Sequence, residues 1–294
     1  MNRKMQNTKA LHRLVLLVLI FCIAASSVGL FSKTGGTSYT VTNQYGDFIR
    51  MYGDGLYSHD SYFKAPIFRA SDATMLFLAV PLLAMGLLYD KKRHCLKSRI
   101  ALASGLFSFT YYSAGLCFGV SYNYLLLLYI ALFSASLFSL GLSLVSIDYP
   151  ELHASITGPL PYRGIYTFLL LTCIALILAW LPDILSALAT GRPLALLEVY
   201  TTEITYVLDM GIISPLAILC LILVRKRLPL GYVVLALLLT LCTLIGIMVP
   251  VQTLFQMAKG IQLTPPEFIT KVASFIALAL FSLYLAIRLF KSIR

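Results

Sequence analysis

The residues best suited to chemistry lie in one apolar stretch, 199–224. Thr202, Tyr206 and Asp209 stand there at i, i+4 and i+7, so they share one face of the helix that the stretch predicts. Glu203 precedes Asp209 by six residues, about 120° round that helix and ~9 Å nearer its outer end. Asp209 lies ten residues into the helix, roughly 15 Å deep, where a carboxylate costs on the order of 2.5–3.5 kcal/mol to insert.

Two interpretations of Asp209 follow from that cost. A buried carboxylate must face the bundle interior or water, pair with a base, or be protonated. Asp209 therefore either binds a proton, a cation or an amine-bearing substrate, or it hydrogen-bonds another helix and fixes the packing. Gln252 in the next apolar stretch is a polar neighbour for this face, and Lys271 in the last stretch either neutralises an acid or reaches to the interface.

The backbone near Asp209 is also weakened. Pro215 cannot donate a hydrogen bond to the carbonyl of Gly211, and Gly246 and Pro250 repeat that spacing in the next apolar stretch. The two helices are therefore expected to kink, freeing carbonyls that neighbours or an ion must satisfy. Broken helices around a site and ordinary proline kinks both fit this pattern.

A second group of polar residues lies between the first and second apolar stretches, namely Asp47, Asp54, His59 and Asp60. Carboxylates beside a histidine can bind a divalent metal or act as a general base, and a solvated, turn-forming loop has the same composition. Their spacing matches no EF-hand, and the chain contains no HExxH, GxSxG or Walker motif. The sequence therefore predicts no metal and no cofactor. Asp72, which follows them, is expected to cap the second helix.

Composition decides the class of elements that must position these residues. Hydrophobic residues are 59% of the 294, charged residues only 12%, and the mean hydropathy is +0.86. An ordinary soluble chain is nearer 45–50% apolar and about 25% charged. The sequence predicts an all-α, polytopic bundle of about eight transmembrane helices in the cell membrane. The expected spans are 11–31, 72–90, 99–120, 123–146, 165–188, 199–224, 230–256 and 268–290.

The net charge of +11 is a topology signal. With both termini in the cytoplasm, sixteen of the 23 Lys and Arg residues fall inside and seven fall outside. That asymmetry is the positive-inside rule, so the basicity predicts no nucleic-acid partner. A cleaved signal peptide ending near Ala24-Ala25-Ser26 is an alternative interpretation of the first stretch.

The chain shows no domain boundary, so residues 1–294 are expected to form a single membrane domain. Residues 32–71 form the one long hydrophilic stretch, and they are rich in Tyr and Phe. Disordered linkers are poor in aromatic residues. We therefore expect an ordered extracytoplasmic loop packed on the outer mouth of the bundle.

The fourth stretch carries a face of small residues at four-residue spacing: Ala131, Ala135, Ser139 and Ser143. Small residues at that spacing allow two helices to approach closely. The partner is either another span or, in a homo- or hetero-oligomer, another chain.

Three short segments resemble segments of uncharacterised bacterial and archaeal multi-pass membrane proteins. They are Gly55-Leu56-Tyr57 with Asp60-Ser61, Ser121-Tyr122-Asn123-Tyr124, and Tyr200-Thr201-Thr202 with Val207-Leu208-Asp209. That resemblance implies no activity. The layout is also similar to membrane-embedded glycosyltransferases, which place acidic residues directly after the first span.

Three functions remain open, so the sequence does not decide whether the chain is an enzyme. The first is a small-molecule or ion transporter or permease component, with an outward-opening pocket of Asp209, Tyr206, Thr202, Glu203, Gln252 and Lys271. The second is an exofacial enzyme that acts on a lipid-linked substrate through Asp47, Asp54, His59 and Asp60. The third is a non-catalytic subunit that docks through the small-residue face of the fourth span.

Overall fold

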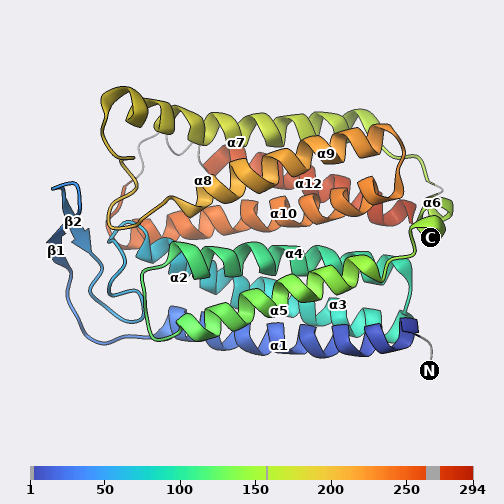
Figure 1. Ribbon diagram of the computed structural model, residues 1–294, viewed down its shortest axis with the longest axis horizontal. Helices are drawn as coiled ribbons and strands as arrows, with labels where there is room; N and C mark the ends of the chain where they lie inside the picture. The colour runs from blue at the N-terminus through green and yellow to red at the C-terminus, as the bar shows by residue number, and fades with distance from the viewer. Residues whose placement is uncertain (1–2, 157, 263–271, 294) are drawn as a thin grey trace.

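The computed structural model is a bundle of long helices with one small β-hairpin at its end (Figure 1). It describes residues 3–156, 158–262 and 272–293. Eight helices in these ranges are long and apolar enough to cross a membrane, as a multi-pass membrane protein requires. Both termini lie at the end opposite the hairpin, which an even number of spans demands.

The first half of the chain holds four of these spans. They are α1 (Arg3–Phe31), a composite second span, α4 (Leu96–Gly119) and α5 (Leu126–Val145). The second span consists of α2 (Ala65–Thr74), the π-helical segment η1 (Met75–Ala79) and α3 (Val80–Arg93). Strands β1 (Tyr39–Thr42) and β2 (Phe48–Met51) pair antiparallel in the loop before it, with Tyr39 opposite Met51.

The second half repeats this order after the short helix α6 (Tyr149–Ser155). Its spans are α7 (Tyr162–Thr190), a composite sixth span, α10 (Pro229–Ala258) and α12 (Ser274–Ser292). The sixth span consists of α8 (Ile204–Leu208), the π-helical segment η2 (Asp209–Ile213) and α9 (Ser214–Arg225). The helical fold and the eight span-length helices agree with the sequence prediction, although several boundaries differ.

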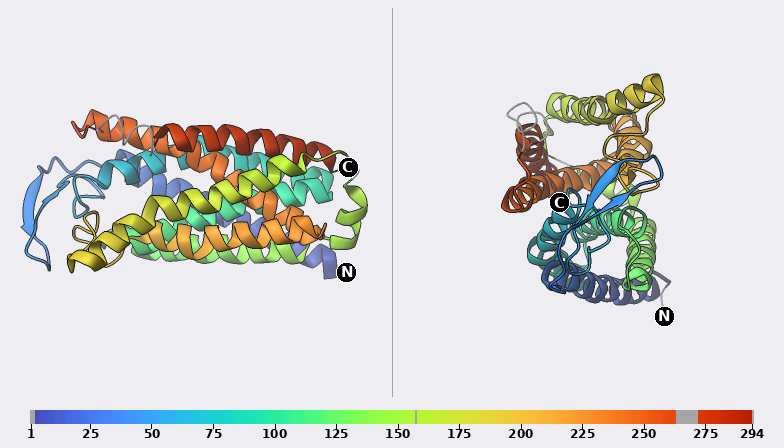
Figure 2. Two further views of the ribbon diagram at one scale, coloured as in Figure 1. Left: turned by 90° about the horizontal axis from the view of Figure 1, so that it is seen from above. Right: turned by 90° about the vertical axis from the view of Figure 1, so that its left-hand side faces the viewer.

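The core has two main parts, one for each half of the chain. One apolar cluster is built mostly from α1, α3, α4 and α5, and the other mostly from α7, α9, α10 and α12. Helix α10 joins them because it packs against both α2 and α4. Figure 2 shows the two groups of helices side by side when the bundle is viewed along its length.

The composite second and sixth spans are the parts that sequence reasoning described least well. Helix α2 begins at Ala65 rather than near Asp72, with proline in its first turn, where a missing N–H costs nothing. Helix α8 begins at Ile204 rather than Val199. Asp209 therefore lies only five residues, about 7.5 Å of helical rise, from the start of its helix.

The expected pair of broken helices also differs. The sixth span widens into a π-turn directly before Ser214 and Pro215, but α10 runs through Pro250 as one continuous helix. The second widened helix is instead the second span, where η1 ends directly before Val80 and Pro81. A proline has no N–H to donate, so the preceding turn widens and accommodates the carbonyl that is left over.

The small-residue face of α5 packs inside the chain. Ala135, Ser139 and Ser143 are buried, and the Ser143 hydroxyl donates to the backbone carbonyl of Arg99 in α4. The face from Ala131 to Ser143 thus meets another span, and the predicted docking of a second chain through it has no support here.

A close helix crossing gives a first prediction. A Cβ added at Gly246 of α10 would overlap the Cβ of Ala279 and lie 2.7 Å from the carbonyl oxygen of Phe275. Gly246→Ala should therefore lower the Tm in nanodiscs, because such overpacking costs about 1–3 kcal/mol.

The control is Gly141→Ala in α5, where an added Cβ meets no atom within 4 Å. Alanine is the better helix former, so this variant should match or exceed the wild-type Tm. Equal Tm values for the two variants would contradict the close packing of α10 on α12.

Candidate functional site

Asp209 lies at the junction between α8 and η2. Its side chain is buried, with the residue only 5% exposed. Its Oδ1 accepts a hydrogen bond from the hydroxyl of Tyr111 at 2.8 Å, and its Oδ2 accepts one from Nε1 of Trp180 at 3.0 Å. These donors come from α4 and α7, so one carboxylate connects three spans. Both donors are neutral, and neither compensates a negative charge with a positive one.

Aromatic rings form one wall beside Asp209. The rings of Trp180 and Tyr206 stack with centroids 4.6 Å apart and planes 23° from parallel. The Tyr206 hydroxyl donates to Oδ2 of Asp183 at 2.8 Å, and Asp183 itself is exposed. Stacking and this hydrogen bond together hold the Trp180 indole in the orientation that reaches Asp209.

An ion pair lies between Asp209 and the hairpin end of the bundle. The Lys64 ammonium contacts Oε2 of Glu203, and both side chains are about nine-tenths buried. The same ammonium lies 4.1 Å from the centroid of the Tyr200 ring. Burial raises the pKa of Glu203, and the adjacent Lys64 lowers it. Lys64 and Glu203 therefore neutralise one another and join the segment between α1 and α2 to the start of α8.

A cavity of about 610 Å³ lies between the two halves of the chain, lined from α2, α4, α7, α8, α10 and α12. Thr202, Glu203, Tyr206, Asp209 and Gln252 all line it, so the structure brings together five of the six residues predicted for a pocket. Lys271, the sixth, lies outside the described residues.

The individual positions differ from the predicted helical face. Thr202 precedes the helix and is exposed at the end of the cavity near the hairpin. Gln252 donates to the Ser71 hydroxyl at 2.8 Å rather than to Asp209. The roles of these residues in binding stay predictions, but their common location does not depend on those roles.

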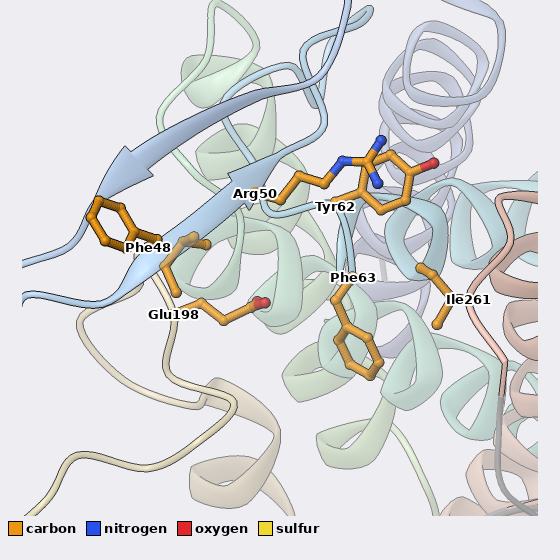
Figure 3. Close-up of a pocket in the computed structure, with 7 residues that line it drawn as sticks. Phe48, Arg50, Tyr62, Phe63, Glu198 and Ile261 are labelled. Carbon is orange, nitrogen blue, oxygen red and sulfur yellow. The ribbon is translucent and has the colours of Figure 1, made fainter.

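A smaller pocket of about 210 Å³ lies beyond the cavity, under the hairpin (Figure 3). Phe48, Ile49, Arg50, Tyr62, Phe63, Glu198 and Ile261 line it. The Arg50 guanidinium lies 3.7 Å from the centroid of the Tyr62 ring. Phe63 lines both spaces, and its backbone carbonyl is held at 3.2 Å by the side-chain amide of Gln256. The Phe63 ring therefore lies between the smaller pocket and the cavity.

The predicted loop residues do not gather into one site. Asp54 accepts from the backbone N–H groups of Thr34 at 2.7 Å and Gly35 at 3.0 Å, and these hydrogen bonds lower its pKa, the one from Thr34 most. Asp47 closes a turn with Asn43. These two carboxylates are turn-forming residues of a surface loop.

The other two loop residues are also separate. His59 is exposed and contacts the Tyr39 hydroxyl at 3.2 Å, whereas Asp60 is buried. No group of three or more His, Cys, Asp or Glu residues in the described part of the chain could hold a metal ion. The loop geometry thus offers no support for shared acid–base or metal chemistry.

Asp60 instead joins three segments at the hairpin end of the bundle. Its Oδ1 accepts from the backbone N–H of Ser121 and from the Tyr200 hydroxyl, each at 2.9 Å. Its Oδ2 is buried without a hydrogen-bond partner. Burial raises the pKa of Asp60 to about 7, against the lowering effect of these donors. Nearby, burial also raises the pKa of Glu198, which accepts from the Ser61 hydroxyl.

Sequence reasoning missed a second buried carboxylate in the membrane, Asp72. It lies within α2 rather than capping it, and it is fully buried. The Tyr57 hydroxyl donates to its Oδ2 at 2.7 Å and the Tyr112 hydroxyl to its Oδ1 at 2.5 Å. The adjacent pair Tyr111-Tyr112 in an apolar stretch was the available signal, because buried tyrosine hydroxyls need acceptors.

Another buried acid, Asp90, lies at the end that holds the termini. Asp90 is fully buried, 3.0 Å from the Arg99 guanidinium and 2.8 Å from Nε2 of His12. It joins α1, α3 and α4. Its contacts are those of a structural residue, since both partners are themselves largely buried and face it.

No family model, curated protein or solved structure matches this chain. The case for a function therefore depends on the geometry of the cavity. Within the described residues, the cavity combines a volume of about 610 Å³ with a buried carboxylate that has no cationic partner.

The pKa of Asp60 gives a second prediction. A carboxylate whose folded-state pKa is raised destabilises the fold as the pH rises from about 4, its ordinary pKa, to about 7. Asp60→Asn should abolish this loss. Its free energy of unfolding should therefore rise relative to wild type across that range by an amount on the order of a few kcal/mol, and its Tm should rise relative to wild type accordingly.

Asp54→Asn is the control, since its pKa is lowered and its effect has the opposite sign. Its wild-type carboxylate stabilises the fold at neutral pH and loses that effect on acidification. Parallel Tm–pH curves for wild type and Asp60→Asn would contradict the buried, unpaired Asp60 oxygen.

Proposed function

We propose that this protein is a small-molecule transporter or permease component of the cell membrane whose binding site is the cavity at Asp209. The observation that carries the proposal is a carboxylate without a cationic partner in the wall of a cavity of about 610 Å³. Small-molecule sites have volumes of about 300–1,000 Å³, apolar walls and a few convergent polar groups.

Asp72 and Asp209 form an internal comparison that supports this assignment. Each carboxylate lies in a span and accepts two hydrogen bonds, one of them from α4. Asp72 does not line the cavity, whereas Asp209 does. A carboxylate needed only for packing would resemble Asp72. Asp209 also borders the cavity, which packing alone does not require.

The composite spans supply the elements that could move. In each, a π-turn ends two residues before a proline, and ten residues after that proline a basic cluster begins, at Lys91 and Arg225. A residue with positive φ, His94 or Arg227, follows each helix. The second and sixth spans thus repeat the same order of π-turn, proline and basic cluster. Transporters built from parallel repeats show internal repetition of this kind. Widened turns of this kind are frequent at functional sites.

The hairpin end of the cavity is the outer end in this proposal, with both termini in the cytoplasm. The positive-inside asymmetry supports that orientation. Cys95, between α3 and α4, then faces the cytoplasm. Partial burial raises its pKa, but hydrogen bonds from Ser98 bring it below the ordinary value, which favours the reactive thiolate.

A membrane-impermeant maleimide tests this orientation. It should label Cys95 in permeabilised cells and not in intact cells, and Cys95→Ser should remove the additional labelling. Equal labelling of Cys95 in intact cells would reverse the proposed topology.

Transport itself is tested in proteoliposomes on a solid-supported membrane, which records charge movement for a panel of amines, amino acids, sugars and organic acids. Asp209→Asn should reduce the current for the transported solute ~10-fold or more, which corresponds to a loss of about 1.4 kcal/mol of interaction. Asp47→Asn, in the exposed turn, is the matched control and should keep wild-type currents. Solute flux that Asp209→Asn leaves unchanged would overturn the proposal.

A further inference from the structure

The charges that line the cavity do not balance. Lys64, Glu203 and Asp209 are the charged side chains among its described lining residues. Lys64 and Glu203 pair with one another. Asp209 is left with two neutral donors, so the described lining carries a net charge of −1 when this carboxylate is ionised.

The hydrogen bonds at Asp209 suit the ionised form. An indole N–H only donates, so Oδ2 is an acceptor toward Trp180, and Oδ1 is placed to accept from Tyr111. An ionised carboxylate accepts through both oxygens, and it has lone pairs left for a further donor or a cation. A ligand with one positive charge would complete the site.

The aromatic residues favour an organic cation. Trp180, Tyr206 and Tyr111 all line the cavity, and the first two stack beside the carboxylate. Rings of this kind attract ammonium groups through their negative faces, and tryptophan does so most strongly. The carboxylate and the indole together form a site suited to a weakly hydrated cation.

A metal ion does not fit the same surroundings. Hard cations such as Ca²⁺ take six to eight oxygen ligands. The described residues hold no group of three or more His, Cys, Asp or Glu residues that could bind a metal ion. The walls beyond Asp209 are mostly apolar, among them Phe68, Met75, Leu241, Met248 and Phe275. Those walls would instead cover the hydrocarbon part of an amphipathic ligand.

From these observations we infer that the cavity binds an organic monocation: an ammonium group at Asp209 and Trp180, carried on an apolar body packed against α2, α10 and α12. The inference rests on the proposed function and names the substrate class of that site.

The chain offers its own reporter because Trp180 is its single tryptophan. Purified protein in phosphatidylcholine vesicles is excited at the indole and titrated with 4-phenylbutyltrimethylammonium, a cation that has no proton to donate. The anionic probe 4-phenylbutanesulfonate has the same apolar body. The wild type should show a saturable change in Trp180 emission with the cation and none with the sulfonate.

Three variants sharpen the test. Asp209→Asn should weaken cation binding ~10-fold or more, the loss of about 1.4 kcal/mol or greater. Tyr206→Leu leaves the carboxylate in place and should weaken binding by a smaller factor through the lost aromatic wall, which also guards against misfolding of Asp209→Asn. Asp47→Asn makes the same chemical change at an exposed carboxylate that does not line the cavity, and it should bind as the wild type does.

The inference is overturned if the cation gives no saturable response, if the sulfonate binds as tightly, or if Asp209→Asn binds the cation with wild-type affinity. Failure of the proposed function looks different. Cation binding without flux of any solute would contradict the transport proposal and support the cation site. Flux of a neutral or anionic solute without cation binding would support transport and contradict the cation site.

Discussion

Two carboxylates buried in an apolar bundle need hydrogen-bond donors, and α4 supplies one to each of them. Tyr111 and Tyr112 are neighbours in the chain, so their side chains leave the helix about 100° apart and reach Asp209 in one half and Asp72 in the other. An unsatisfied polar group costs several kcal/mol in hydrocarbon. The position of α4 between the halves is therefore a requirement of these acids as well as a result of packing.

The segments at the hairpin end of the bundle are joined by the same kind of interaction. Asp60, Lys64 and Ser61 of the first loop contact Tyr200, Glu203 and Glu198 of the segment before α8, and Asp60 also holds Ser121. This polar layer lies between the hairpin and the cavity, so any opening of the cavity in that direction has to break some of these contacts. Its central carboxylate is also the one whose ionisation is sensitive to pH near 7.

Much of the architecture could be predicted because hydropathy alone marks membrane spans. The count of eight span-length helices and five of six pocket residues followed from apolar stretches and from the cost of burying Asp209. The irregular parts could not be predicted in this way. Helix α2 starts at Ala65, so it contains Pro66 and the buried Asp72. A search for apolar stretches assigns such residues to a loop and therefore starts the span too late.

Long-range partners were also beyond the sequence. Nothing in residue spacing shows that Trp180 reaches Asp209 across 29 residues or that Lys64 reaches Glu203 across 139. The widened turn before Pro81 was overlooked because that proline lies in a stretch without a glycine at the position four residues earlier, unlike Pro215. Both carboxylates accept a hydrogen bond on each oxygen, so only packing in three dimensions distinguishes Asp72 from Asp209, which lines the cavity.

The order of residues along the chain bears on how the protein is made. Trp180 and Tyr111 are both synthesised before Asp209, so a nascent sixth span enters a membrane that already contains its two donors. Asp72 has only half of this advantage, because Tyr57 precedes it but Tyr112 is synthesised 40 residues later. The second span would therefore leave the translocon most readily together with α4, as a helical hairpin in which the carboxylate and its tyrosine partition into lipid as a pair.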